Sequence, residues 1–285
     1  MKIVFFGTNR LAQIVLEELI KSNYKPQLII TAPDKKAGRG QRRQMSPVKQ
    51  TALKNNLEIL QPESLSNVIF KFQVSSFKFD IAILVAYGQI IPKEILIAPK
   101  YGFINVHPSL LPKYRGPSPI QTAILAGEQK AGISIILLDE KIDHGPILAQ
   151  KKITIATNDT HASLIEYLGK IGARLLIQIL PEYLAGSLKP KTQNDSQATF
   201  SKHIKKSDGY IDLNNPPDPQ TFDRMIRAFY LWPGTWCRLM VNGKWLIVKF
   251  LPGNLIQPEG KQPMLLSEFT NGYPNLFKQL GKLFT

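Results

Sequence analysis

The chain has 285 residues, 44% of them hydrophobic, which suits two domains with substantial cores. Its 36 Lys and Arg against 21 Asp and Glu give a formal net charge of +15, which an enzyme of small neutral metabolites does not need and which indicates a polyanionic partner. The single cysteine, Cys237, excludes an internal disulfide, and no Cys/His spacing suggests a zinc site, so we expect no metal and a reducing, cytoplasmic setting.

The first elements of the chain predict alternating strands and helices. Residues 3–6 form an apolar run too short for a signal peptide core, and they predict a buried strand. Apolar positions at helical spacing over 11–21 predict a helix that completes a βα unit. Further strands are predicted over 27–32, 80–86 and 101–107. No stretch approaches ~18 apolar residues, so we expect no membrane-spanning helix.

The same alternation continues to about Gly186. A helix with proline near its first turn is predicted over 117–125, followed by strands over 132–138 and 147–155. A long helix with an apolar stripe is predicted over 160–184. These elements predict an α/β domain, whose bounds we place at residues 1–186.

The second half begins after a polar segment. Residues 187–205 lack apolar periodicity and carry Pro, Thr, Asn, Gln and Ser, which predicts a basic linker. A helix over 221–230 and two short strands over 234–251 follow, and Asn242-Gly243 between the strands is a strong hairpin signal. Short strands with tight turns predict a small barrel over 206–285.

Basic residues are concentrated in two segments. Residues 34–49 hold six of them against one acid, and two glycines make us expect a flexible loop. Residues 189–206 hold five, with Asp195 as the single acid. A charge run alone is commonly no more than a solvated surface. The basic residues are Lys35, Lys36, Arg39, Arg42, Arg43 and Lys49 in the loop and Lys189, Lys191, Lys202, Lys205 and Lys206 in the second segment.

Three polar residues carry the strongest functional signal: Asn105, His107 and Asp143. Alternate side chains of a strand share a face, so Asn105 and His107 would point together near the strand's carboxyl end, where open α/β sheets bind ligands. Pro108 then ends the strand. An amide and an imidazole can stabilise an oxyanion, while a carboxylate can orient the imidazole or relay a proton. By contrast, the lone Gly7 after the first strand is not a dinucleotide fingerprint and indicates a tight turn.

Five sequence pieces, in this order along the chain, resemble the folate-dependent formyltransferases, and the resemblance covers nearly the whole chain. Each piece is weak alone, but the set is hard to obtain by chance. The pieces are Ala37-Gly38-Arg39-Gly40 with Ser46-Pro47-Val48-Lys49, Val85-Ala86-Tyr87-Gly88, the run Asn105-Val106-His107 with Ser109-Leu110-Leu111-Pro112, Arg227-Ala228-Phe229 with Trp232-Pro233, and Gln257-Pro258-Glu259-Gly260-Lys261.

The resemblance implies a Rossmann-like catalytic domain with a mostly parallel sheet, followed by a small OB-like β-barrel that is shortened here. It implies 10-formyltetrahydrofolate as co-substrate, with Asn105 and His107 flanking the formyl oxygen and Asp143 paired to His107. His144, in contrast, is interpreted as incidental. The folate is expected to contact two segments, which comprise Ser109, Leu110, Leu111 and Pro112 and also Tyr87, Gly88, Gln89 and Ile90.

The resemblance also implies the acceptor: the amino group of initiator methionyl-tRNA, formylated for translation initiation by a cytoplasmic enzyme that we expect to be monomeric. In this context the two basic segments favour tRNA phosphates over a merely solvated surface. The expected tRNA contacts are Lys36, Arg39, Arg42, Arg43, Lys205 and Lys206.

Three alternatives stay open at this point. Formylation of a nucleotide-linked amino sugar uses the same catalytic residues, but so small a substrate leaves the basic loop without a role. Glycinamide ribonucleotide formylation fits less well, because those enzymes typically stop after the catalytic domain. An RNA-binding module that has lost its activity is disfavoured by the presence of all three catalytic residues.

Overall fold

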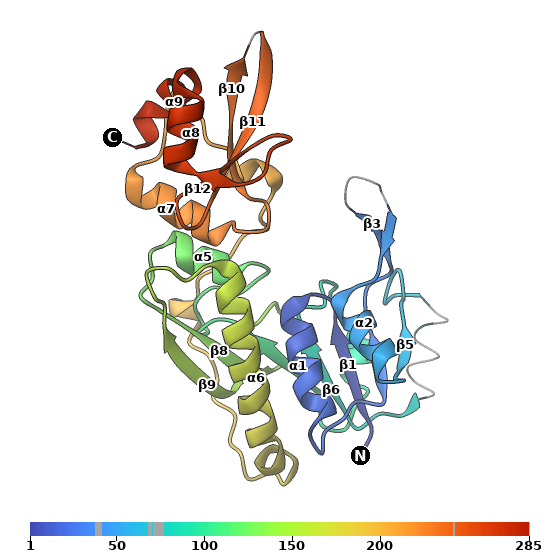
Figure 1. The fold of residues 1–285 in the computed structure, drawn as a ribbon. Coiled ribbons are helices and arrows are strands. Elements are labelled where there is room, and N and C mark those ends of the chain that lie inside the picture. Colours follow the sequence, from blue (N-terminus) through green and yellow to red (C-terminus); the bar gives the residue numbers. More distant parts are fainter. Residues whose placement is uncertain (38–41, 68–69, 71–76, 242, 285) are drawn as a thin grey trace. The chain divides into compact units, whose positions relative to one another are not determined.

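The computed structural model describes residues 1–37, 42–67, 70, 77–241 and 243–284. The chain divides into two compact units (Figure 1). The first unit comprises Met1–Pro119, Lys130–Ile153 and Ile165–Ser201, and the second comprises Ile120–Gln129, Thr154–Leu164 and Lys202–Thr285.

The first unit is built on a seven-stranded sheet with the order β5-β2-β1-β6-β7-β8-β9. The first five strands in this order run parallel, and β8 joins β7 antiparallel. Strands β1, β2 and β7 are buried along their whole length, as both-faces-apolar sequences predict for a covered parallel sheet. The strands are β1 (Ile3–Gly7), β2 (Leu28–Ile30), β5 (Glu58–Leu60), β6 (Ile81–Val85), β7 (Phe103–His107), β8 (Lys130–Leu137) and β9 (Ile147–Thr154).

Local signals set where the helices of this sheet begin. Asn9 caps α1 by accepting a hydrogen bond from the backbone of Ala12, and Ser46 caps α2 in the same way from Lys49. Proline stands at the first position of α2, where its missing N–H costs nothing. The helices of the first unit are α1 (Arg10–Ile20), α2 (Pro47–Lys54), the short α4 (Lys93–Leu96) and most of α6 (His161–Leu184), whereas α5 (Pro119–Leu125), except for its first residue, and the first four residues of α6 belong to the second unit.

Two glycines let α6 approach the sheet closely. A Cβ atom at Gly172 would lie 2.8 Å from Val106 of β7 and 3.0 Å from Ile133 of β8, and one at Gly169 would lie 3.0 Å from Ile14 of α1. These separations are tighter than ordinary side-chain contacts, so the missing side chains allow α6 to pack directly on α1 and on the strand that carries Asn105 and His107.

The second unit contains a four-stranded antiparallel sheet with the order β10-β11-β12-β13. Alternate residues of β10 are buried, and Cys237 is one of them. Burial raises the pKa of its thiol to about 12. The elements are α7 (Pro219–Ala228), β10 (Thr235–Val241), β11 (Lys244–Leu251), β12 (Leu255–Pro258), β13 (Met264–Leu265), α8 (Leu266–Gly272) and α9 (Pro274–Leu280).

The structure departs from the sequence prediction in two segments. The expected flexible loop over 34–49 contains a two-stranded antiparallel ladder of β3 (Lys35–Ala37) and β4 (Arg42–Gln44), followed by α2. Polar basic strands lack the apolar alternation that signals a strand, which is why the ladder was not predicted. The expected linker over 187–205 has little regular structure, but it bonds extensively to the first unit up to Ser201. Within the described residues, no helix is both long and apolar enough to span a bilayer.

His161, the first residue of α6, generates a prediction about stability against pH. Burial lowers the pKa of its imidazole to about 4, from 6.5 in an ordinary environment, and the amino end of a helix also disfavours a cation. Between these two pKa values the imidazole is protonated in the unfolded chain but neutral in the folded chain. The free energy of unfolding is therefore at its full value above pH 6.5 and decreases as the pH falls towards 4. We expect His161→Gln to reduce the loss of unfolding free energy between pH 7 and 5 by about 1 kcal/mol.

The measurement is urea denaturation at both pH values. His203→Gln, at an exposed histidine, is the matched control and should keep the wild-type dependence on pH. An unchanged slope in the His161 variant would contradict the role given to this residue.

Candidate active site

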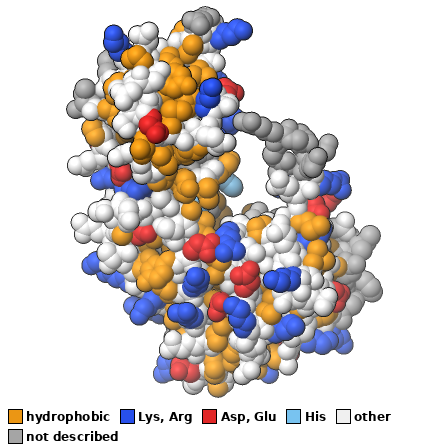
Figure 2. Space-filling model, in the orientation of Figure 1, with side chains coloured by type: hydrophobic (Ala, Val, Ile, Leu, Met, Phe, Trp, Pro, Cys, Tyr) orange, Lys and Arg blue, Asp and Glu red, His pale blue; other side chains and the backbone are white. Residues whose placement is uncertain are grey.

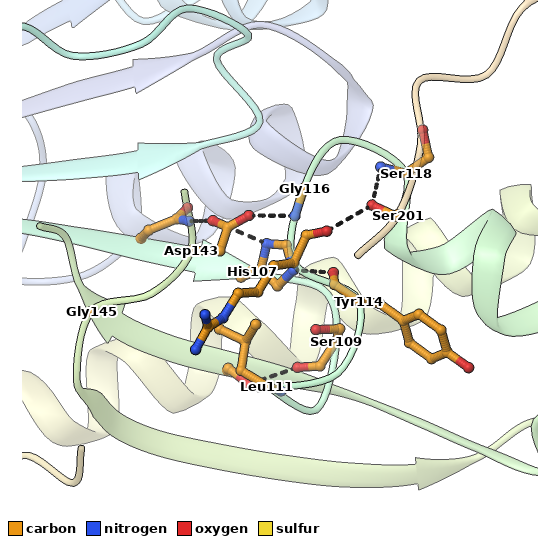
Figure 3. A network of polar contacts seen from close by, with 12 residues as sticks. His107, Ser109, Leu111, Tyr114, Gly116, Ser118, Asp143, Gly145 and Ser201 are labelled. Carbon is orange, nitrogen blue, oxygen red and sulfur yellow. Dashed lines mark hydrogen bonds and ion pairs between the residues drawn. The ribbon is translucent and has the colours of Figure 1, made fainter. Parts of the chain in front are cut away.

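Asn105 and His107 both lie on β7, and His107 is the last residue of that strand, at the carboxyl edge of the parallel strands. Asn105 pairs with Leu84 of β6 on one side and with Ile136 of β8 on the other, so the sheet holds its backbone from both flanks. Only 5% of the surface of Asn105 and 4% of that of His107 is exposed. Asp143 reaches the same place from the loop between β8 and β9 (Figure 3).

The carboxylate of Asp143 joins these groups. Asn105 Nδ2 donates to Asp143 Oδ1 at 3.1 Å, and the backbone N–H of Gly116 donates to Oδ2 at 2.8 Å (Figure 3). His107 Nδ1 lies 3.5 Å from Asp143 Oδ1, while its Nε2 lies 3.0 Å from the carbonyl oxygen of Tyr114. Both ring nitrogens of His107 therefore face oxygen atoms of neighbouring groups.

The Asp143 loop is tightly constrained. Asp143 has a φ of +48°, a left-handed conformation that a side chain with a Cβ atom adopts at a cost. Two residues later, a Cβ atom at Gly145 would lie 1.8 Å from the carbonyl oxygen of Leu137, so only glycine fits. The N–H of Leu137 in turn bonds the carbonyl of Pro146 at 3.0 Å. The loop thus has little freedom to carry the carboxylate elsewhere.

The segment between β7 and α5 closes over the site. Ser109 Oγ donates to the carbonyl of Lys113 at 2.7 Å, and Ser134 Oγ of β8 donates to the carbonyl of Ser109 at 2.6 Å. Tyr114, with a φ of +60°, and Gly116, with a φ of +107°, then turn their backbone groups toward His107 and Asp143. The site is therefore built from backbone groups as well as side chains.

The residues expected to contact folate lie just after two neighbouring strands of the sheet. Tyr87 to Ile90 follow β6, and Ser109 to Pro112 follow β7, which pairs with β6. The ring of Tyr87 is 3% exposed within the core, and its buried hydroxyl finds no partner among the described residues. That burial raises the pKa of the hydroxyl. Ile90, in contrast, is 80% exposed.

The residues expected to contact tRNA lie in both units. Lys36 and Arg42 belong to β3 and β4, Arg43 is exposed on β4, and Arg39 lies outside the described residues. Lys205 and Lys206 are exposed in the second unit. Lys and Arg side chains are spread widely over the face drawn in Figure 2.

Several residues of the site had not been singled out from the sequence. Gly116 and Tyr114 contribute backbone groups, which no side-chain pattern reveals, although Gly116 stands at a position that requires a positive φ. Gln193 contacts the Asp143 loop from 50 residues away. His144, interpreted as incidental, bonds Asp139 and approaches Asp195 Oδ2 at 3.3 Å. Among the described residues, no cluster of three His, Cys, Asp or Glu could hold a metal ion.

Comparisons with known proteins agree on one family. The family model described as formyl transferase matches residues 1–180. A methionyl-tRNA formyltransferase of Thermodesulfovibrio yellowstonii is 38% identical over 296 residues, with 95% of each chain covered. One of Chloroflexus aurantiacus is 41% identical over 236 residues, which cover 83% of this chain and 76% of the relative.

Among solved structures, a sugar N-formyltransferase from a Shewanella species superimposes with a TM-score of 0.67. The superposition covers 88% of this chain and 98% of the other, at 17% sequence identity. At that identity the likeness shows a shared fold.

The Gly145 contact generates a prediction about the loop. Gly145→Ala places a methyl group against the Leu137 carbonyl, so the loop must shift, and we expect a loss of about 2 kcal/mol or more in unfolding free energy. Denaturant unfolding measures the loss. Gly272→Ala, where nothing lies within 4 Å of the added Cβ and φ is not positive, is the control and should stay within about 0.5 kcal/mol of wild type. Equal stability of both variants would refute the constraint.

Proposed function

The chain belongs to the formyl transferase family, and from that premise we propose that it transfers the formyl group of 10-formyltetrahydrofolate to the free amino group of initiator methionyl-tRNA. The product, N-formylmethionyl-tRNA, would serve translation initiation. One observation carries the proposal: an amide, an imidazole and a carboxylate meet at the carboxyl edge of the sheet, in a chain that is 38% identical to a methionyl-tRNA formyltransferase over 95% of its length.

The proposed chemistry needs no covalent enzyme intermediate. The neutral amine attacks the formyl carbon, the carbonyl oxygen becomes an oxyanion, and the bond from carbon to the folate nitrogen then breaks as that nitrogen gains a proton. Asn105 would stabilise the oxyanion through the N–H that Asp143 does not accept, and His107 would do so when the formyl oxygen replaces one of its present oxygen partners. Donors aimed at developing charge in a dry site contribute strongly. Asp143 would hold both donors and pass the proton from the amine towards the leaving nitrogen.

We also propose that the folate lies against the ends of β6 and β7. Tyr87, Gly88, Gln89 and Ile90 would form one side of its pocket, and Ser109 to Pro112 the other. The adjacency of the two strands supports this, because both segments leave the same sheet edge as Asn105. The exposed Ile90 also offers apolar surface for a planar ring.

The tRNA would contact the basic hairpin of β3 and β4. This hairpin follows β2, so it stands on the same carboxyl edge of the sheet as Asn105. Asp34 ties down its base by accepting from Gln61 Nε2 at 2.9 Å and from Lys49 Nζ at 2.7 Å, and these bonds lower the pKa of the Asp34 carboxyl. A basic hairpin whose base is held in place in this way could insert into an RNA groove.

The division of labour is proposed as follows. Residues 1–186 would carry the chemistry, and 187–205 would connect the two domains. Residues 206–285 would bind tRNA through an OB-like fold that includes Lys206, and Lys205 would assist from the end of the linker. The antiparallel strands β10 to β13, with one apolar face, support an OB-like arrangement. We propose that the enzyme acts as a monomer in the cytoplasm, where translation begins.

A formyl-transfer assay tests the function. We expect formylation of charged initiator tRNA well above that of charged elongator tRNA, and none of an aminated nucleotide sugar. Asn105→Ala and His107→Ala should each lower turnover roughly a hundredfold or more, because each removes an oxyanion donor. Circular dichroism checks their folding. If the enzyme formylates the nucleotide sugar in preference to the charged tRNA, the proposed acceptor is wrong. If a folded Asn105 or His107 variant keeps more than about a third of wild-type turnover, the role given to that residue is wrong.

The basic hairpin gives a separate prediction. Replacing Arg39, Arg42 and Arg43 with alanine should weaken binding of methionyl-tRNA and flatten its salt dependence by roughly one unit of slope per lost phosphate contact, while folate affinity stays at the wild-type value. The matched control replaces Lys25, Lys54 and Lys100, three exposed lysines at the opposite, amino edge of the sheet. If the two triple variants show equal salt dependence of tRNA binding, the hairpin makes no phosphate contacts and is only a solvated surface.

A further inference from the structure

We infer that Gln193 is a positioning residue for the reaction, one that acts by holding Asp143; this inference rests on the function proposed above. Gln193 belongs to a segment after α6, Lys191–Ser201, that we call the strap. The strap starts at a backbone bridge to β9, where Lys191 and Ile147 exchange two hydrogen bonds of 2.8 Å. It then runs along the active-site loops of the first unit.

Gln193 grips the backbone of the Asp143 loop. Its Nε2 donates to the carbonyl of Asp143 and to the carbonyl of Gly145, both at 2.8 Å. Its Oε1 accepts two bonds from the Arg115 guanidinium, at 2.9 Å from Nη2 and 3.2 Å from Nε. Since Arg115 can only donate and the carbonyls can only accept, the amide has a single satisfactory orientation. Gln193 is 8% exposed and Arg115 is 4% exposed, so water does not compete for these bonds.

The hydrogen bonds from Gln193 hold the loop at the position where its backbone is strained. Asp143 has its positive φ directly before the carbonyl that Gln193 holds, and a residue in that conformation persists only when its surroundings determine it. The same residue must aim its carboxylate at Asn105 and Gly116. Losing the amide donors would let the peptide after Asp143 rotate and move the carboxylate away from both partners.

Arg115 links Gln193 to a second residue of the strap, Asp195. Its Nη2 donates to Asp195 Oδ1 at 2.7 Å, a bond that lowers the pKa of the Asp195 carboxyl, and His144 approaches the other carboxylate oxygen of Asp195. The residue after Asp143 is thereby linked to the strap as well. The chain of contacts encloses the Asp143 loop from two sides.

The end of the strap fixes the other loop of the site. Arg115 N–H donates to the Thr199 carbonyl at 2.9 Å, and Ser201 N–H donates to the Arg115 carbonyl at 2.8 Å. Tyr114 N–H bonds Thr199 Oγ1 at 2.9 Å. Ser201 Oγ accepts from Ser118, and Figure 3 shows it beside the segment that carries Gly116. One strap thus holds both loops that converge on Asp143.

Gln193→Leu tests the inference, because leucine matches the size of glutamine and removes all four bonds. We expect kcat to fall at least tenfold while KM for tRNA and for folate stays within about threefold, since a displaced catalytic group impairs the reaction step and not binding. Gln193→Glu keeps an acceptor for Arg115 and loses the donors to Asp143, so it should fall as far. Gln27→Leu is the matched control: it loses bonds to Ile3 and Lys25 at the opposite sheet edge and should keep wild-type kcat.

A double-mutant cycle separates positioning from general support. In the Asp143→Asn background, Gln193→Leu should lower the remaining kcat less than twofold, because the group it positions has already lost its charge. Multiplying effects, or a Gln193→Glu variant with wild-type kcat, would overturn the inference.

Two further measurements separate a failure of this inference from a failure of the proposed function. The cycle is run on methionyl-tRNA and on an aminated nucleotide sugar in parallel, so it reports on whichever amine the wild-type enzyme formylates. A crystal structure of Gln193→Leu is read independently of activity. We expect the Asp143 carboxylate to have left Asn105 Nδ2 and the Gly116 N–H, and an unmoved carboxylate would refute the role of Gln193.

Discussion

The carboxylate of Asp143 is the interaction on which the arrangement of the site depends. It accepts from a side-chain amide and from a backbone N–H, and it lies beside an imidazole, so three separate parts of the first unit meet on two oxygen atoms. Its own backbone is held in a left-handed conformation next to Gly145, which alone can pass the Leu137 carbonyl. A short, glycine-dependent turn therefore aims one charged group with little tolerance.

This precision is assembled from distant segments. The strand that carries Asn105 and His107 is fixed by its neighbours in the sheet and by α6, which its glycines bring close. The Asp143 loop gains its support from the strap, more than 40 residues later in the chain. Loops of this kind are attached to a rigid sheet, and the strap, which ends at Ser201, gives the Asp143 loop a second attachment within the first unit.

Charge distribution matches the size of the proposed acceptor. A folate and a small amine would fill only the sheet edge, whereas a tRNA would extend over tens of ångströms of phosphate. The net charge of +15 is large for a chain of 285 residues, and the basic hairpin stands on the same sheet edge as Asn105 and His107, with its base held through Asp34. In the proposed function, long-range attraction to phosphates and short-range chemistry would thus be carried by different parts of one surface.

The sequence by itself predicted most strands of the seven-stranded sheet, the helices α1, α5 and α6, the hairpin of β10 and β11, and the shared face of Asn105 and His107, but not β3, β4, β5, α2 or α4. These follow from local periodicity, turn residues and strand alternation, each of which is written within a few neighbouring residues. The sequence also singled out Asp143, through a resemblance and not through geometry. Only the tertiary structure decided the roles of Gly116 and Gln193. Backbone donors have no residue signature, and hydrogen bonds between segments about 50 residues apart exist only once the sheet has brought those segments together.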